Sequence, residues 1–250
     1  MRQESPLKKE SISVESCSYD HRLNILHGLP FYSMLDHHSL QAINSSYSEH
    51  GYQPGETIYL SGKKSTRFYV IAIGKVKLLE HTSSGHNVLL DILGPGEFLG
   101  GSWTEDQTTH FHSETAIALT QCCILEIDRS DFKDIASKHA AVAMKFLEIL
   151  ESRMRMLQTR VKMQATASVE RRLAFTIYKF ADKLGKPTKN GVLIQFPFSR
   201  ADLAEFSGTT PETASRIVSQ FKKKGLLETG RQWMTVKDVL RLSAIAEIDE

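Results

Sequence analysis

The sequence lacks a long hydrophobic run, a secretory signal and a paired set of cysteines. No stretch of about 18 consecutive apolar residues occurs, which excludes a membrane-spanning helix. Residues 1–20 are polar and contain no apolar signal-peptide core, so we expect a mobile N-terminal arm and a cytoplasmic protein with no membrane partner. Only three cysteines are present, Cys17, Cys122 and Cys123, and this count excludes the disulfide framework of small secreted proteins.

A large net charge is also absent, but the charge is unevenly distributed. The whole chain has 31 Lys and Arg against 29 Asp and Glu, a formal charge of +2. Residues 168–250 hold 14 Lys and Arg against 10 Asp and Glu, so this part carries +4 and the remainder −2. The basic excess favours a nucleic-acid partner for the C-terminal part of a chain long enough for two domains.

Residues 50–128 have the pattern of short strands separated by turns. The segments "ETIYLSG", "RFYVIAIGKVKLLEH", "HNVLLDILGPGEF" and "ETAIALTQCCILEID" are rich in β-branched, aromatic and other apolar residues. Turn residues such as Pro54-Gly55 and Gly94-Pro95-Gly96 separate them. We expect a closed or sandwiched all-β unit with a helix over residues 35–46 in front of it, and we assign residues 21–137 to this sensor domain.

A long helix is predicted after the strands. Residues 128–173 contain no Gly or Pro and many strong helix formers. Five apolar residues follow each other at alternating spacings of three and four, namely Leu147, Leu150, Met154, Leu157 and Val161. This spacing is typical of the seam of a two-stranded coiled coil, so we predict a dimerisation helix over residues 138–167. The alternative is a single amphipathic helix packed on its own domain.

Residues 168–250 predict short helices and a β-hairpin. The amphipathic segment 169–184 is expected to be a helix, and "GVLIQFPFS" a short strand. Ser199 and Asp202 have the spacing of a capping box at the start of a helix in "RADLAEFSG". The segment "GLLETGRQWMTVKD" indicates a hairpin with Thr229-Gly230 near its tip.

The segment "GTTPETASRIVSQFKKKG" completes a helix, a tight turn and a second helix. Thr209 or Thr210 can cap the second helix, and Pro211 suits its first position because no N–H is needed there. Four apolar residues are expected to face the core, namely Ala214, Ile217, Val218 and Phe221. Glu212, Ser215, Arg216 and Ser219 then share the opposite face. The alternative is a solvated face with an ordinary Glu–Arg pair at four-residue spacing.

This helix pair predicts a DNA-binding helix-turn-helix, in which the first half of the second helix enters the major groove. An Arg there can donate two bonds to guanine, and a Glu can accept from the cytosine amine. The run Lys222, Lys223 and Lys224, together with the hairpin, would meet phosphates, which position a protein without reading sequence. The predicted DNA contacts are Arg200, Thr210, Glu212, Ser215, Arg216, Ser219, Lys222 and Lys223.

The order of these parts resembles the Crp–Fnr family of bacterial transcription regulators. The segments "YQPGETIYLSG", "FYVIAIGKVKLL", "LGPGEFLGG" and "SRADLAEFSGTTPETASRIVSQFKKKGLLE" carry the resemblance, which covers nearly the whole chain after His21. It implies an α+β fold with an N-terminal double-stranded β-helix like that of cyclic-nucleotide-binding domains, a long dimerisation helix and a C-terminal winged helix-turn-helix. It also implies a homodimer without enzymatic activity, with double-stranded DNA and RNA polymerase as partners; whether it is an activator or a repressor stays open.

The pattern E-x-x-S-R on the second helix resembles the Fnr branch of that family. The resemblance implies half-sites like TTGAT, with Arg216 at the guanine, Glu212 at its cytosine partner and Ser215 near a thymine. A two-fold symmetric protein then predicts an inverted repeat whose half-site centres are about 34–36 Å apart.

The effector residues of cyclic-AMP receptors are not retained. Gly101 stands where those proteins have the Glu that holds the ribose, and His112 where they have the Arg that holds the cyclic phosphate. Because this Arg is the bidentate phosphate partner, we do not expect cyclic AMP. A four-cysteine iron–sulfur cluster is excluded by the count of three. By the resemblance, the effector pocket comprises Gly100, Gly101, Ser102, Trp103, His110, His112, Ser113, Leu157 and Gln158.

The segment "TTHFHSE" places His110 and His112 two residues apart on a predicted strand, so both could point to one side. Such a pair could bind a metal, a haem iron or an anionic ligand. The alternatives are exposed histidines beside the pocket, an effector-independent regulator controlled by its abundance, and a jelly-roll metal enzyme with these two residues as catalytic ligands. For Cys122 and Cys123 we expect one buried and one outward side chain rather than a redox switch.

Overall fold

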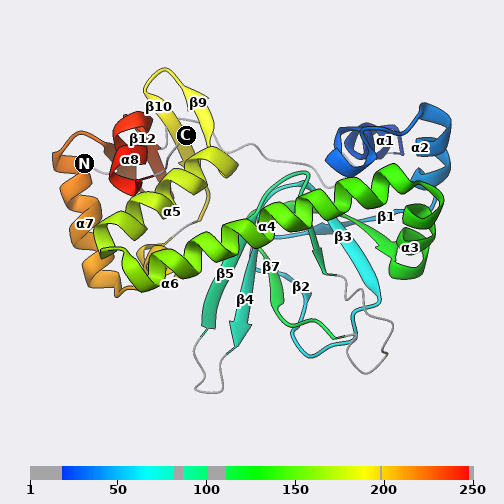
Figure 1. Ribbon diagram of the computed structural model, residues 1–250, viewed down its shortest axis with the longest axis horizontal. Coiled ribbons are helices and arrows are strands. Elements are labelled where there is room, and N and C mark those ends of the chain that lie inside the picture. Colours follow the sequence, from blue (N-terminus) through cyan, green and yellow to red (C-terminus); the bar gives the residue numbers. More distant parts are fainter. Residues whose placement is uncertain (1–18, 82–86, 101–110, 198, 248–250) are drawn as a thin grey trace. The chain divides into compact units, whose positions relative to one another are not determined.

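The computed structural model describes residues 19–81, 87–100, 111–197 and 199–247 (Figure 1). The chain divides into two compact units, and the boundary between Met156 and Leu157 falls inside helix α4 (Ala140–Thr166). Each unit has its own strands and its own core. Among the described residues no helix combines the length and the apolar character that a bilayer span requires.

Two four-stranded sheets form the centre of the first unit. One has the order β1-β8-β3-β6, formed by Ser48–Tyr52, Cys122–Asp128, Arg67–Ile73 and Phe98–Gly100. The other has the order β2-β7-β4-β5, formed by Thr57–Tyr59, Thr115–Ala118, Val76–His81 and Asn87–Leu93. All neighbouring strands are antiparallel. In each sheet a strand from the end of the unit lies between two earlier strands: β8 between β1 and β3, and β7 between β2 and β4. The predicted sandwiched all-β unit is therefore confirmed.

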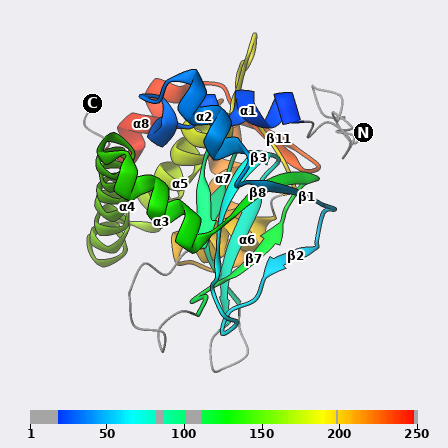
Figure 2. The ribbon, with the colours of Figure 1, turned by 90° about the vertical axis from the view of Figure 1, so that its right-hand side faces the viewer.

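Helices cover the outer face of the first sheet. They are α1 (Tyr19–Gly28), the short 3-10 helix η2 (Pro30–Tyr32), α2 (His37–Asn44), α3 (Arg129–Lys138) and the beginning of α4. In Figure 2, α1 and α2 lie over the ends of β1, β3 and β8. A cluster of aromatic rings fills the space beneath them, namely Phe31, Phe68, Phe98, Phe132 and Phe146. The expected helix over residues 35–46 is α2.

Because both faces of this sheet are covered, the expectation for the two adjacent cysteines is wrong. Cys122 points into the core between the two sheets, and Cys123 points into the core under the helices. Both are buried. The helices over Cys123 lie outside the strand, so the pattern of the strand alone could not show them.

The predicted long helix is present but begins later than expected. His139 has φ −121° and ψ 86°, and this non-helical residue separates α3 from α4. The first turns of α4 pack on their own unit, because Val142 and Phe146 are buried in the aromatic core and Leu150 lies partly against it. The alternative of a helix packed on its own domain therefore holds for this side of α4.

The second unit combines helices with a four-stranded antiparallel sheet of order β11-β12-β10-β9. Its helices are α5 (Val169–Leu184), α6 (Arg200–Ser207), α7 (Pro211–Lys223) and α8 (Val239–Ala246). Its strands are β9 (Lys186–Thr188), β10 (Gly191–Gln195), β11 (Leu227–Gly230) and β12 (Trp233–Val236). Helices α5, α6 and α7, strand β10 and the hairpin were predicted, whereas β9 and α8 were not. The hairpin turn lies at Arg231 and Gln232, since Gly230 still pairs with Trp233.

Candidate DNA-binding surface and effector pocket

Local signals define both ends of α6, the first helix of the helix-turn-helix. The Ser199 hydroxyl accepts from the Asp202 amide, and the Asp202 carboxylate accepts from the Ser199 amide, which is the expected capping box. Helix α6 ends at Gly208, whose φ of 61° is left-handed, and the Thr209 amide donates to the Ala204 carbonyl at 2.9 Å. The beginning of α6 and the turn that follows it are therefore each held by hydrogen bonds.

Helix α7 begins where the sequence predicts. The Thr210 hydroxyl accepts from the Thr213 amide at 3.3 Å, and Pro211 occupies the first turn. The four residues expected in the core are buried, namely Ala214, Ile217, Val218 and Phe221. Burial of this row sets the rotation of α7 and turns the opposite side chains toward solvent.

The opposite face presents the predicted polar group. Glu212, Ser215, Arg216 and Ser219 are all exposed. Ser219 donates back to the Ser215 carbonyl at 2.8 Å, a bond within the helix. Within the described part of the chain, Glu212 and Arg216 make no ion pair with each other or with another residue. The alternative of an ordinary Glu–Arg pair is therefore wrong, and both groups keep their bonding capacity for a ligand.

The remaining predicted DNA contacts differ in how exposed their side chains are and in whether those side chains already have a partner in the protein. Lys222 and Lys223 are exposed, whereas Lys224 bonds Glu170 with 3.0 Å between Nζ and Oε1. Because Lys224 is itself exposed and its ammonium group has further donors, its grouping with the phosphate contacts stays a prediction. Thr210 is exposed, but its hydroxyl is used in the helix cap. Arg200 is half-buried at the start of α6, and burial lowers its pKa from the usual value.

Two further residues were missed from the sequence, one on this surface and one behind it. Arg231 is exposed in the two-residue turn of the β11–β12 hairpin, where Gln232 has a φ of 62°. Its place directly after Gly230 was an available signal for a basic group at the hairpin tip. Arg172, on α5, donates to backbone carbonyls of the helix-turn-helix, and nothing local in its sequence indicates this.

The predicted effector pocket is described only in part. Gly101, Ser102, Trp103 and His110 lie outside the described residues. Leu157 and Gln158 are exposed on α4 within the second unit. Gly100, His112 and Ser113 belong to the first unit.

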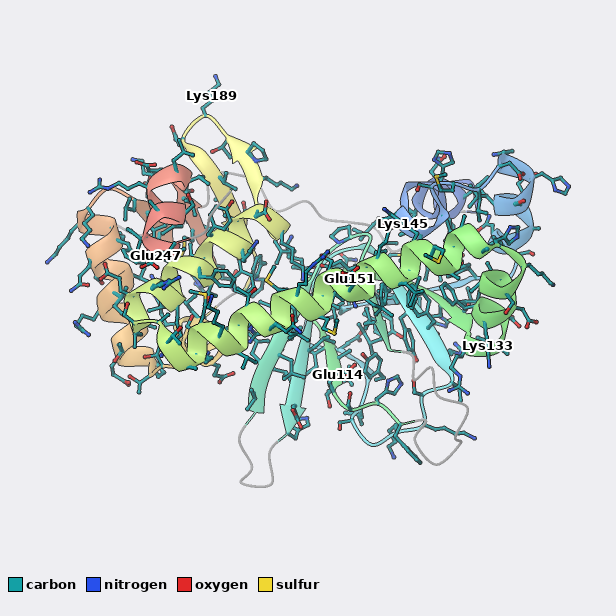
Figure 3. The ribbon with its side chains drawn as sticks, in the orientation of Figure 1. Glu114, Lys133, Lys145, Glu151, Lys189 and Glu247 are labelled. Atoms are coloured by element: carbon teal, nitrogen blue, oxygen red, sulfur yellow. The ribbon has the colours of Figure 1, made fainter. Side chains whose placement is uncertain are left out.

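His112 is buried, at 5% exposure, and the alternative of an exposed histidine is wrong for it. Its imidazole stacks on the Tyr59 ring with 3.7 Å between centroids and 12° between planes. The Tyr59 hydroxyl donates to Glu114 Oε1 at 2.8 Å, and the Ser113 hydroxyl donates to Glu114 Oε2. Figure 3 labels Glu114, the residue directly before β7. Tyr59, His112, Ser113 and Glu114 are therefore a set of side chains in contact with one another, and His112 does not point into solvent.

The electrostatics of this group follow from burial. Burial lowers the pKa of His112 from its ordinary 6.5, and the nearby Glu114 charge opposes that shift. His112 is therefore neutral at pH 7. Burial, with the Glu114 charge as a second cause, raises the pKa of Tyr59 well above its ordinary value, so its hydroxyl remains a donor. No cluster of three His, Cys, Asp or Glu with metal-holding geometry is found among the described residues.

Gly100 fits this site for a steric reason. Its φ of 73° is left-handed, and an added Cβ would lie 2.8 Å from Cδ2 of Tyr69. The backbone of β6 therefore lies directly against the Tyr69 ring, which is itself 5.3 Å from the Tyr59 ring between centroids. Tyr59, Tyr69 and His112 together fill this part of the space between the sheets.

Arg153 on α4 makes contacts within the first unit that the sequence did not indicate. Its Nη2 donates to the Phe98 carbonyl at 3.0 Å and lies 3.8 Å from Glu97 Oε1, while its guanidinium carbon is 3.9 Å above the Phe98 ring. The pKa of Arg153 is lowered from its usual value because burial disfavours the charged form, and the Glu97 charge opposes this shift. The sequence placed this residue outside the dimer seam, and the structure shows what it contacts.

An exposed apolar row runs along the other side of α4. In their own units, the exposed fractions are 57% for Leu147, 54% for Met154, 57% for Leu157 and 71% for Val161. Leu150, the remaining predicted seam residue, is partly buried. Four exposed apolar residues at coiled-coil spacing on one helix are uncommon without a partner surface.

Comparisons with known proteins agree with this architecture. Residues 49–139 match the model of the cyclic nucleotide-binding domain, and residues 171–245 match the Crp-like helix-turn-helix domain. The chain is 24% identical over 219 residues to the cyclic AMP receptor protein of Thermus thermophilus, covering 88% of this chain and 97% of that protein. It is 22% identical over 194 residues to the fumarate and nitrate reduction regulatory protein of Salmonella typhimurium, covering 78% of this chain and 76% of that protein. The fold is similar to that of FixK2 from Bradyrhizobium japonicum, with a TM-score of 0.72 at 21% identity over 82% of this chain and 99% of that chain.

Proposed function

This chain is a DNA-binding transcription regulator of the Crp–Fnr family, and we propose that it binds an inverted repeat of TTGAT-like half-sites as a homodimer. Its matched domains are those of transcription regulators rather than enzymes, so we do not retain the alternative of a jelly-roll metal enzyme using His110 and His112. The proposal places its action in the cytoplasm, with RNA polymerase as a further partner.

The exposed face of α7 is the observation that carries the proposal. A carboxylate, a hydroxyl and a guanidinium share the first half of this helix, and no described residue pairs with Glu212 or Arg216. Arg216 would donate two bonds to the guanine of TTGAT, Glu212 would accept from its cytosine partner, and Ser215 would contact a thymine. Lys222, Lys223 and Arg231 would meet phosphates beside the groove.

The exposed row on α4 supports the homodimer. Leu147, Met154, Leu157 and Val161 have the spacing of a two-stranded seam, and a second copy of α4 presents the same apolar row. Two copies related by a two-fold axis would present two α7 helices to two half-sites. A second copy of this chain is therefore the partner that matches both the helix and an inverted repeat.

For the β unit we propose an effector other than cyclic AMP. The Arg that would hold the cyclic phosphate is replaced by His112, and this imidazole is buried, stacked and neutral. Among the described residues, His112 lies in the Tyr59 stack and both Glu114 oxygens accept hydroxyl bonds, so our proposal assigns neither haem nor metal to these residues.

An effector-independent regulator is the second candidate function. Tyr59, Tyr69 and Leu99 are buried between the sheets beside His112, so the protein's own side chains occupy this part of the interior. A regulator of this kind would be controlled by its abundance. It would bind the repeat with the same affinity whether purified alone or with cell extract metabolites.

Fluorescence anisotropy tests the DNA proposal. A labelled duplex carrying two inverted TTGAT half-sites, with centres about 34–36 Å apart, is compared with a random duplex and with a repeat whose centres are shifted by about half a turn. We expect the first duplex to bind at least about 10³-fold more tightly than the random one. Native mass spectrometry of the complex then counts the chains. Equal affinity for the three duplexes would reject the proposed half-sites, and one chain per repeat would reject the homodimer.

A further inference from the structure

The guanidinium of Arg172 joins two separate segments of the second unit. Its Nε donates to the Ser207 carbonyl at 2.8 Å, its Nη1 to the Ala167 carbonyl at 2.8 Å and its Nη2 to the Gly208 carbonyl at 3.0 Å. Ala167 follows the last residue of α4, whereas Ser207 and Gly208 form the end of α6 and the turn of the helix-turn-helix. One planar fork therefore connects the end of α4 to the turn that precedes α7.

These three carbonyls are chemically suited to a guanidinium. The last carbonyls of a helix have no partner within that helix and carry the negative end of its dipole. Two helix ends, those of α4 and α6, meet at Arg172. An Arg offers several N–H donors in a fixed plane, whereas a Lys offers a single point charge that cannot reproduce this geometry.

The same turn has two further contacts that restrict its position. Gly208 lies against Gln164 on α4, since an added Cβ would be 2.4 Å from its Oε1. The Ser207 hydroxyl donates to the Thr176 hydroxyl at 3.0 Å in the buried interior. Helix α7 begins three residues after Gly208, so a movement of the turn would move the recognition face with it.

We propose that Arg172 is the positioning residue that fixes recognition helix α7 to the end of α4. It does so without contacting DNA, and it sets the discrimination between target and random sequences rather than the strength of phosphate binding. This inference rests on the proposed function, because discrimination is measured on the TTGAT repeat.

The neighbouring Arg171 offers a matched control. It lies on the same helix and has the same charge, and it also binds a helix end: its Nε donates to the Ala246 carbonyl at 3.2 Å and its Nη1 lies 2.7 Å from Glu247 Oε2. Those partners belong to the end of α8 and not to the turn before α7. Loss of Arg171 therefore removes comparable contacts and leaves the turn intact.

The test uses the full-length chain with Arg172→Gln, Arg172→Lys and Arg171→Gln. Affinities for the repeat and for random DNA are measured over a series of salt concentrations, beside hydrogen exchange of residues 207–213. For Arg172→Gln we expect the affinity for the repeat to fall about tenfold or more, since hydrogen bonds to a charged group are lost. The affinity for random DNA should fall less than about threefold and the salt slope should stay unchanged, because no phosphate contact is removed. Exchange in the turn should become faster.

Arg172→Lys keeps the charge and most of the volume, so it serves if the glutamine variant does not fold. We expect it to lose several-fold of the affinity for the repeat and to show faster exchange in the turn, and we expect Arg171→Gln to do neither. If Arg172→Lys kept the full affinity for the repeat and Arg172→Gln showed a smaller salt slope, Arg172 would be a phosphate contact. That result would overturn the inference. Unchanged exchange in both variants would overturn it as well. If the unmodified protein does not distinguish the repeat from random DNA, the proposed half-sites fail, while the exchange result still decides the role of Arg172.

Discussion

Glu212 and Arg216 lie four residues apart on the exposed side of α7 and leave each other unpaired. In an isolated helix such a pair would stabilise by about 0.2–0.5 kcal/mol. Because no described residue pairs with Glu212 or Arg216, neither group has to give up a bond to that part of the chain on binding a ligand.

Glu212→Ala should change recognition but not stability. We expect the free energy of unfolding to change by less than about 0.5 kcal/mol, as for a surface substitution without partners. The preference for the base pair at the cytosine partner should weaken by about 1–3 kcal/mol. Urea unfolding and anisotropy on duplexes with single base changes measure the two effects. A large loss of stability would show that Glu212 has a structural role.

Arg216→Ala and Lys223→Ala should weaken DNA binding in different ways. Arg216→Ala should cost about 1–3 kcal/mol on the repeat and relax the preference at the guanine. Lys223→Ala should weaken binding to all sequences alike and reduce the salt slope by about 1. Titrations at several salt concentrations separate these outcomes. Parallel losses on target and random DNA for both variants would contradict the assigned roles.

Met154→Glu should separate the two chains. A carboxylate in the seam would be buried against its symmetry copy, where burial of unpaired charge and repulsion are both unfavourable. We expect native mass to change from twice 28.2 kDa to the 28.2 kDa of one chain. Ser152→Glu is the matched control, because Ser152 is exposed on α4 two residues away and outside the seam. A dimer that survives Met154→Glu would remove α4 as the interface.

His112 should make the stability of the protein depend on pH. Burial holds its pKa below the ordinary 6.5 in the folded state, so the unfolded chain binds the proton more readily. The contribution is therefore fully present above about pH 6.5 and is lost as the pH falls from there toward the lower folded pKa. His112→Phe, which keeps a ring for the Tyr59 stack, should flatten this part of the profile in urea unfolding. His38→Gln, at an exposed position, should leave it unchanged.

The features predictable from the sequence are those that depend on neighbours along the chain. The Ser199 capping box, the Thr210 cap and the buried row from Ala214 to Phe221 all follow from spacings within a few residues. They determine which face of α7 is exposed, so the exposure of Glu212, Ser215, Arg216 and Ser219 was predicted correctly, and their contact with DNA stays a prediction.

The features that were missed depend on distant residues. His112 is buried by Tyr59, which lies more than 50 residues before it in the sequence and pairs with Ala116 of β7. The three carbonyls bound by Arg172 lie up to 36 residues from it. Strand β9 contains Pro187 and exists because it pairs with β10, so its own composition gave no sign of a strand.

The contact between Gly208 and Gln164 makes the acceptable residues at these two positions depend on each other. Any larger residue at 208 would overlap the amide of Gln164, and its backbone would still have to adopt a φ of 61°. Shortening Gln164 to Ala creates room but does not relieve the backbone. Of the larger residues, Asn at 208 combined with Ala at 164 meets both demands, because Asn tolerates the left-handed region. Asn at 208 alone would require the Gln164 amide, the far end of a flexible side chain, to move aside, whereas Gln164→Ala alone would leave Gly208 and the turn unchanged.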